Sequence, residues 1–475
     1  MSLTDLERRL AEDLDYLDLP AASWVPPRRA GDEPVTDVLI VGAGMCGLAA
    51  LAELRMLGID KAFAVDAAPE GFEGPWETFA RMRTLRSPKT LTGPALDLPA
   101  LTFRAWFTAQ WGAGAWDRLG KIPKDQWMDY LRWYRRVLAL PVRNDTRLTD
   151  LRAEGPYLRV TLQGPDGESR LLARRVVLAT GRSGLGGGAA PACLETLDPR
   201  FWAHSADDID FEALRGRDVV VVGAGASAMD NAATALEAGA ARVDLLIRRD
   251  TLPAVNKLTG IGSPGTVHGL AHLPDDWKLK IHSYAMAEQV PPPSHSVRRV
   301  SEHANAQFHF GCALTGAEVE GKRLRVDTSR GSFATDFLIA ATGFRNDFAD
   351  RAELSAIAPH VLSWADRPDF PDSLPAQGPL GQSPYLAADF TFLEKIPGSC
   401  PALARIHCFN DAAMLSHGKV SGDIPAVSTG AKRLGRAIAA AFFCEDRAAQ
   451  FDRLRAFDTA ELAGDEWTPA PRLPG

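Results

Sequence analysis

The chain has 475 residues, 46% of them hydrophobic and 24% charged, and a formal net charge of −7 at pH 7. This length and composition indicate a globular protein of two or three domains. A net negative charge gives no reason to expect nucleic acid or an anionic membrane as a partner. No apolar run approaches the roughly 20 residues that span a bilayer, and the N-terminus lacks a signal pattern, so we expect a cytoplasmic protein.

The first predicted element is an N-terminal helix over residues 3–17. Leucines recur there at helical spacing, and Thr4 with Glu7 predicts a capping box at the start. We expect residues 1–33 to form a helical arm without a chemical role.

The next segment, residues 37–50, combines an apolar strand, a Gly-x-Gly-x-x-Gly turn and the start of a helix. Gly42 allows the tight turn, Gly44 lets a pyrophosphate approach the helix N-terminus, and Gly47 allows close packing of helix and strand. A second strand ends on Asp66, where a carboxylate would accept hydrogen bonds from a ribose. The predicted FAD-binding residues here are Gly42, Ala43, Gly44, Cys46, Gly47 and Asp66.

An aromatic-rich stretch follows, with six of the eleven tryptophans between Trp76 and Trp133. Most such aromatics belong to a core, and we interpret this helical face so, but Trp76 is also a candidate flavin contact. The basic run from Arg81 to Lys89 fits a core less well. It is either a solvated loop or a source of cations for the flavin or for an acidic substrate, and Arg86 and Lys89 are our candidate catalytic residues.

The first glycine turn and its two strands are followed by a β-ribbon, which leads to an Ala-Thr-Gly strand end at Thr180 and Gly181. The same order of ribbon and strand end recurs at Thr342 and Gly343, after a second glycine turn. The whole unit of glycine turn, ribbon and strand end therefore occurs twice in the chain. Both strand ends are predicted to lie beside a dinucleotide.

The second glycine turn starts at Gly223, after the strand 218–222, and has Ala228 in the third small position. Its second strand ends on Arg248 and Arg249, which suit a ribose 2′-phosphate, although two arginines at a strand end are also compatible with plain solvation. The predicted NADPH-binding residues are Gly223, Gly225, Ala226, Ser227, Arg248 and Arg249.

Residues 250–310 depart from the simple strand–helix pattern and hold six of the ten histidines. No acid or cysteine completes a ligand set with them, so we expect no metal, and we interpret the segment as a lid or a substrate-facing insert. The six cysteines of the chain form no C-x-x-C pair, which does not favour a redox disulfide.

Near the C-terminus, Asp423 and Pro425 precede a long helix rich in small residues. The N-terminus of that helix would stabilise negative charge on a reduced flavin. Asp423 either holds a ribityl hydroxyl or is a plain helix cap.

These elements predict an α/β protein with two Rossmann-like dinucleotide-binding domains and helical or loop insertions. The FAD domain is discontinuous, and the NADPH domain is inserted into it. The predicted order is the arm (1–33), the first part of the FAD domain (34–208), the NAD(P)H domain (209–334) and the second part of the FAD domain (335–475).

The two glycine turns, the arginine pair and the paired Ala-Thr-Gly ends resemble the class B flavin monooxygenases, which include flavin-containing, Baeyer–Villiger and N-hydroxylating enzymes. The chain departs from their Phe-x-Gly-x-x-x-His pattern, because Asp198 and Arg200 stand where Phe and Gly are expected before His204. The resemblance implies that NADPH reduces FAD and that O₂ adds at flavin C4a. The resulting (hydro)peroxide would then oxygenate a small-molecule substrate.

Two other functions stay open at this level. One is an NADPH-dependent flavin oxidoreductase that does not oxygenate, and the other is a flavin-binding regulatory or scaffold protein. The expected partners are a small-molecule substrate and O₂, with homo-oligomer formation possible.

Overall fold

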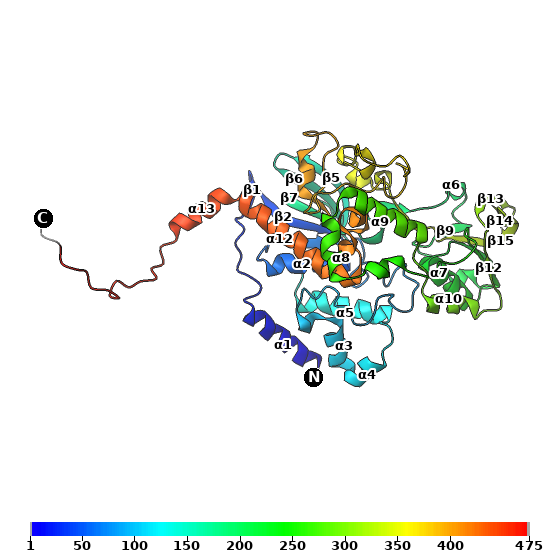
Figure 1. The fold of residues 1–475 in the computed structure, drawn as a ribbon, viewed down its shortest axis with the longest axis horizontal. Coiled ribbons are helices and arrows are strands. Elements are labelled where there is room, and N and C mark those ends of the chain that lie inside the picture. Colours follow the sequence, from blue (N-terminus) through cyan, green and yellow to red (C-terminus); the bar gives the residue numbers. More distant parts are fainter. Residues whose placement is uncertain (1, 473–475) are drawn as a thin grey trace.

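The computed structural model describes residues 2–472 and shows an α/β protein built on two main sheets, as predicted. Figure 1 shows the first sheet near the centre and the second sheet, with its helices, at one side of the molecule. The C-terminal segment projects from the opposite side.

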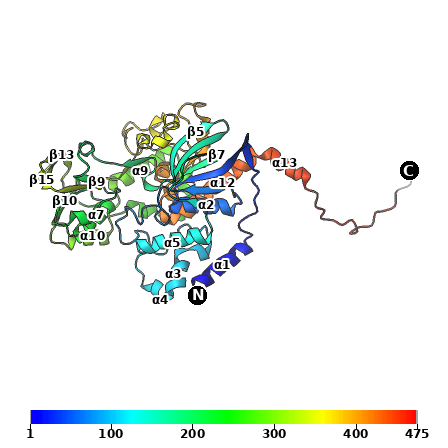
Figure 2. The same cartoon turned by 180° about the vertical axis from the view of Figure 1, so that it is seen from behind.

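The first sheet has eight strands in the order β4-β3-β2-β7-β6-β5, with β1 beside β2 and β18 beside β7 (Figure 2). The strands β2, β3, β7 and β18 run parallel, so their carboxyl ends meet at one edge. The bounds are β1 (Arg28–Ala30), β2 (Glu33–Val41), β3 (Ala62–Val65), β4 (Val142–Arg143), β5 (Arg147–Glu154), β6 (Tyr157–Gly164), β7 (Gly167–Leu178) and β18 (Ile406–Cys408).

The second sheet is parallel throughout, in the order β12-β11-β10-β16-β9. Two of its strands lie outside the predicted range 209–334, because the apolar strand β16 pairs with β10 and then with β9. The unit that this sheet defines therefore extends on both sides of that range. The bounds are β9 (Trp202–His204), β10 (Asp218–Val222), β11 (Arg242–Leu246), β12 (Ala306–His309) and β16 (Phe337–Ala340).

The two ribbons of the repeat differ in where they pair. In the first unit the ribbon extends the main sheet. The reason is that β7 is 12 residues long and pairs with β6 in the ribbon and with β2 in the parallel part of the sheet. In the second unit the ribbon is a separate sheet of β13 (Leu314–Glu320), β14 (Arg323–Thr328) and β15 (Gly331–Thr335). The chain crosses between the two main units at β8 (Gly186–Gly188) and β17 (Phe344–Asn346), which pair antiparallel.

Two helices pack on each other against the first sheet, α2 (Met45–Met56) and α12 (Val427–Glu445). The C-terminal helix α12 can approach closely because Gly435 faces the side chains of Glu53 and Leu57. Eleven of the twelve residues of α2 are buried, so this helix lies in the interior of the protein.

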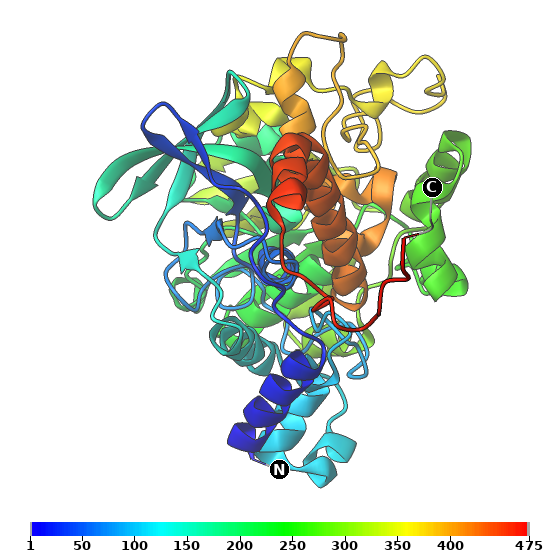
Figure 3. The ribbon, with the colours of Figure 1, turned by 90° about the vertical axis from the view of Figure 1, so that its left-hand side faces the viewer.

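The N-terminal helix α1 (Leu3–Tyr16) packs on α3 (Phe103–Trp111), as Figure 3 shows. The predicted capping box is wrong by two residues: Ser2 and Asp5 form it. Glu7 instead accepts hydrogen bonds from Trp133 and Arg136. The aromatic face of α5 (Lys124–Val137) is buried as core, and α4 (Ala113–Arg118) lies between α3 and α5 in the chain.

The insert between β11 and β12 is mainly helical. It comprises η4 (Lys257–Ile261), α8 (Pro264–Gly269), η5 (Leu270–His272), α9 (Asp275–Glu288) and α10 (Ser294–Ser301). Helix α10 packs on α7 (Ala226–Glu237) of the second unit, whereas α9 packs on α11 (Met414–His417) of the first. The insert therefore joins the two units.

The chain continues beyond α12 as α13 (Arg447–Ala456) and an extended segment, and both project from the body (Figures 1 and 2). Helix α13 buries none of its residues. Within residues 2–472, no helix is both long enough and apolar enough to cross a membrane.

Candidate functional site

The first glycine turn closes against the carboxyl end of β7. Gly42 has φ +99°, and a Cβ on it would lie 2.5 Å from Ala179 O. A Cβ on Gly47 would lie 1.9 Å from Gly42 O, so no larger residue fits there. The N-cap of α2 is Gly44, which leaves the first N–H groups of the helix available for a phosphate.

Asp66 lies beside this turn, at the end of β3. Its Oδ2 accepts a hydrogen bond from Ala43 N (2.7 Å), and its Oδ1 accepts one from Ala68 N (2.9 Å). These bonds fix the carboxylate next to the turn while lone pairs remain on both oxygens. The arrangement suits a ribose with two hydroxyl groups.

Trp76 lies near the same turn and supplies a donor without an acceptor. Its side chain is buried, and its Nε1 has no hydrogen-bond partner among residues 2–472. A Cβ on Gly74 would lie 3.9 Å from that Nε1 and 3.7 Å from Gly44 Cα, so Gly74 stands between Trp76 and the turn. A buried N–H without a partner is costly, so this position fits a bound dinucleotide.

A buried amide that the sequence analysis missed, Asn410, organises the end of β7. It donates to Leu178 O (3.0 Å) and to Thr180 Oγ1 (3.1 Å). Thr180 in turn donates to Gly184 O, while Gly181 turns the chain with φ +71°. The signal was present in the sequence, because Asn410 follows the apolar run of β18 and parallel strands end at one edge.

Two carboxylates face this edge, Asp411 and Asp423. Burial raises the pKa of Asp411, and the charges of Arg182 and Lys419 oppose that shift. The side chain of Asp423 makes no cap hydrogen bond at η13 (Ile424–Ala426), so the helix-cap interpretation is not supported. Asp423 is half-buried and available to a ligand.

Cys46 is a packing residue of the turn. Its thiol donates to Ser421 O (3.3 Å), and burial raises its pKa to about 12. Burial likewise raises the pKa values of Cys193, Cys400 and Cys408. The six cysteines are all unpaired, and these four are poor nucleophiles because they stay protonated.

The structure separates the two candidate catalytic cations. Arg86 donates to Pro291 O of the insert (2.8 Å). Partial burial lowers the pKa of Arg86, and the nearby charge of Asp423 opposes that shift. Lys89 instead donates to Trp116 O (2.7 Å) at the end of α4 and lies over the Trp116 ring. Of these two residues, Arg86 therefore lies between the insert and the sheet edge that carries Asp411 and Asp423, and Lys89 does not.

The second glycine turn has the same backbone but a more open setting. Gly223 has φ +140°, and its Cβ would lie 2.5 Å from Ala341 O. The methyl group of Ala228 occupies the place that Gly47 leaves empty in the first unit. Around Gly225, the N-cap of α7, no described atom would lie within 4 Å of a Cβ. Ser227, in the first turn of α7, is exposed, and Ala226 is half-buried.

The two arginines after β11 have different roles. Arg249 donates to Ala287 O (2.7 Å) near the C-terminal end of α9 and so holds the insert. Arg248 is exposed and has no hydrogen-bond or carboxylate partner in the described part of the chain. Arg248 is therefore the residue that is free to bind a 2′-phosphate.

Thr342 and Gly343 lie where the chain leaves the second sheet. Thr342 donates to Ala189 O, and Gly343 O accepts hydrogen bonds from Ala189 N (2.9 Å) and His204 Nε2 (2.8 Å). Burial lowers the pKa of His204, so a neutral histidine braces the crossing of the units. Thr342 and Gly343 thus hold the connection between the two units in place at the carboxyl edge of β16.

Two of the buried polar atoms in the insert that lack a hydrogen-bond partner among residues 2–472 are Asn256 Oδ1 and His282 Nε2. Burial and the charge of Lys419 lower the pKa of His282 to about 4, so its ring is neutral at physiological pH. The sequence analysis did not single out either residue. Nowhere in residues 2–472 do three His, Cys, Asp or Glu side chains gather as metal ligands.

Comparison with known proteins identifies the family. A family model described as pyridine nucleotide-disulphide oxidoreductase matches residues 39–316. The chain belongs to this family. A curated relative, the FAD-dependent urate hydroxylase of Xanthomonas campestris pv. campestris, is 38% identical over 99% of both chains.

Solved structures share the fold of this family member. An ornithine hydroxylase from Pseudomonas aeruginosa matches 86% of the chain and 99% of its own, with 14% identity and a TM-score of 0.66. An ornithine N-hydroxylase from Kutzneria sp. 744, solved with reduced FAD, NADP⁺ and L-ornithine, matches 86% of the chain and all of its own, at 17% identity and the same TM-score.

The relatives confirm the main predictions from the sequence. The chain is a flavoprotein oxidoreductase, and it is an FAD-dependent monooxygenase, as the sequence predicts. The unpaired cysteines agree with oxygenation rather than with disulfide exchange, despite the description of the family.

Proposed function

We propose that this monooxygenase hydroxylates urate or a closely related oxidised purine. The observation that carries the proposal is the 38% identity to a urate hydroxylase over 99% of both chains. One oxygen atom of O₂ enters the purine and the other leaves as water, with two electrons and a proton from NADPH and one further proton from solvent. When bound, FAD supplies the transfer of those electrons from NADPH to O₂.

We propose that FAD is held by the first turn (Gly42, Ala43, Gly44, Cys46 and Gly47) with Asp66, Trp76, Thr180, Gly181 and Asp423. The uncapped start of α2 and the unpartnered Trp76 Nε1 support this assignment. NADPH would lie on Gly223, Gly225, Ala226 and Ser227 with its 2′-phosphate on Arg248. Arg249, Thr342 and Gly343 shape this site through the contacts of α9 and of the crossing.

Urate carries a negative charge at neutral pH, and the junction of the two units offers cations and neutral donors for it. Arg86 is held by Pro291 O, and Lys419 lies close enough to lower the pKa of His282. We propose that α9 of the insert, which packs on α11 of the first unit, excludes water from the bound substrate. We propose Arg86, and not Lys89, as the cation that orients the substrate.

The test is steady-state turnover of the FAD-loaded protein with urate, xanthine or L-ornithine. Urate should stimulate NADPH and O₂ consumption and give one hydroxylated product per NADPH. Hydroxylation of ornithine without turnover of urate would refute the purine assignment. Arg86→Gln should raise KM for urate about tenfold, the lower end of what loss of a charged hydrogen bond costs, whereas Lys89→Gln should leave KM unchanged.

We also propose that the protein forms a homo-oligomer through its C-terminal segment. Five large apolar side chains there are 55–70% exposed: Phe451, Leu454, Phe457, Leu462 and Trp467. Arg453 holds α13 to the body by donating to Trp24 O (2.9 Å), so Phe451 and Leu454 on this helix have a defined position. Light scattering should show an oligomer that a chain ending at Asp446 no longer forms; a monomeric full-length chain would refute this.

A further inference from the structure

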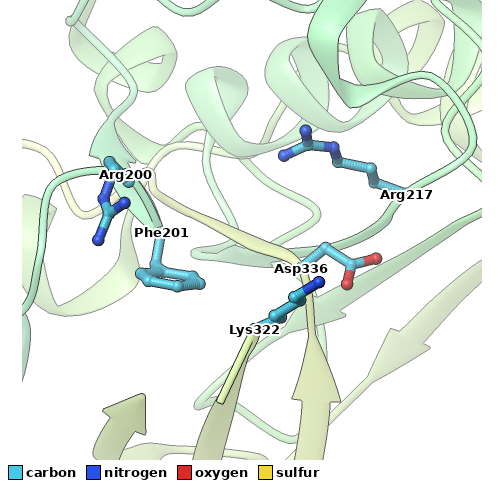
Figure 4. A pocket seen from close by; sticks show the side chains of 5 residues that line it. All are labelled: Arg200, Phe201, Arg217, Lys322 and Asp336. Atoms are coloured by element: carbon cyan, nitrogen blue, oxygen red, sulfur yellow. The ribbon is translucent and has the colours of Figure 1, made fainter. Parts of the chain in front are cut away.

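The second sheet has a basic cavity at its amino-terminal edge, opposite the dinucleotide turn. Its volume is about 360 Å³, within the range of small-ligand sites. The lining residues are Arg200, Phe201, Arg217, Lys322 and Asp336 (Figure 4).

The position of the cavity follows from the parallel strands. Arg217 immediately precedes β10, Asp336 precedes β16, and Phe201 precedes β9. Gly223 stands at the other end of β10, six residues or about 20 Å from Arg217. The cavity is therefore separate from the NADPH site on the same sheet.

The charges in the cavity are unbalanced. Asp336 already accepts hydrogen bonds from Asp218 N (2.8 Å) and pairs with Arg323 (3.2 Å), and Arg200 pairs with Asp198 (2.6 Å). Neither Arg217 nor Lys322 has a carboxylate within 4.0 Å among residues 2–472. Two free cations on facing walls favour a phosphate or another compact anion.

Two further features narrow the ligand class. Phe201 is half-buried and presents its ring to the cavity between Arg200 and Lys322 (Figure 4). A flat apolar wall suits stacking by an aromatic base. The carboxylate of Asp336 keeps free lone pairs. They disfavour a bare polyanion, but they can accept a hydrogen bond from a hydroxyl or amino group of a ligand.

We propose that this cavity binds a small nucleotide, a nucleoside monophosphate or diphosphate, as a ligand distinct from NADPH. The phosphate contacts Arg217 and Lys322, the base packs on Phe201, and Asp336 accepts a hydrogen bond from the ribose or the base. The inference does not depend on which substrate the enzyme hydroxylates.

The experiment is calorimetric titration of the FAD-loaded protein with AMP, in the presence of saturating NADP⁺ and at fixed ionic strength. FAD and NADP⁺ occupy the two dinucleotide sites, and urate added at saturation occupies the purine site proposed above, so binding of AMP reports a further site. We expect one saturable site, with adenosine binding at least tenfold more weakly than AMP. No saturable binding of AMP would overturn the proposal.

Variants separate the two parts of the site. The double variant Arg217→Glu/Lys322→Glu should abolish AMP binding, while Arg298→Glu, which reverses an exposed arginine on α10, should not change it. Phe201→Leu should weaken AMP about fivefold or more and leave inorganic phosphate unaffected. Unchanged binding in the double variant, or equal affinity for phosphate and AMP, would overturn the nucleotide assignment. Flavin content and KM for NADPH confirm that each variant is folded.

Discussion

The two glycine turns share one strand–turn–helix design, but the protein surrounds them differently. The first turn is covered by Gly74, Trp76 and Ser421, and its helix α2 lies beneath α12. In the second turn Gly225 and Ser227 are exposed, and Arg248, the cation proposed for the 2′-phosphate, faces solvent. The same local motif therefore suits a retained flavin in one unit and an exchanging NADPH in the other.

From this difference we infer that the motif selects the chemical group that is bound, while burial around the turn controls how readily the cofactor dissociates. A cofactor enclosed by packed elements dissociates only when those elements move, because packed interiors deform little. A co-substrate that must exchange at every turnover needs an open turn. Four changes test this comparison, and they follow in order of decreasing expected effect.

Gly47→Ala should give protein without flavin. A Cβ there would lie 1.9 Å from Gly42 O, and relief of that overlap would displace the turn at a cost of about 3 kcal/mol or more. The flavin absorbance of the purified protein measures the effect. Full flavin occupancy in this variant would show that FAD does not use the first turn.

Arg248→Ala should weaken NADPH about 10- to 150-fold and leave NADH nearly unchanged, since one charged phosphate contact is worth about 1.5–3 kcal/mol. KM values for the two cofactors measure the change. Arg249→Ala is the matched control: its side chain holds α9, so it should affect both cofactors equally. Equal losses for Arg248→Ala would remove the 2′-phosphate assignment.

Acid should destabilise the first unit through its buried histidines. Burial, Arg433 and Lys278 lower the pKa of His417 to about 3, while Asp389 opposes the shift. The ring is therefore neutral in the folded protein. Its contribution to the free energy of unfolding is complete above pH 6.5 and is lost as the pH falls toward 3, because the unfolded chain then binds a proton that the folded protein does not.

The free energy of unfolding should fall by about 2 kcal/mol between pH 6.5 and pH 5 from this residue alone. His417→Gln, which can still accept the hydrogen bond from Arg433, should flatten that dependence. Urea unfolding followed by flavin fluorescence at the two pH values measures it. If the free energy of unfolding of His417→Gln falls by the same amount between the two pH values, groups other than His417 cause the acid sensitivity.

Ala228→Gly should have the smallest effect. Glycine in a helix costs about 0.5–1 kcal/mol relative to alanine, and the second turn already accommodates the methyl group. Thermal unfolding should show this small loss with KM for NADPH unchanged. A loss as large as that of Gly47→Ala would mean that the two turns are equally constrained.

The sequence by itself determined the fold class, both glycine turns and the choice of cofactors. Those features are local: four apolar residues, spaced glycines and a terminal acid or arginine are sufficient to specify a strand, a turn and the group it binds. The separate roles of Arg248 and Arg249, and of Arg86 and Lys89, depended on tertiary structure, because adjacent or nearby residues can contact different elements. Asn410 and His282 acquire their roles from strands and helices that meet only after folding. The extent of the second sheet was likewise decided by pairing between β9, β16 and β10, which are distant in the chain.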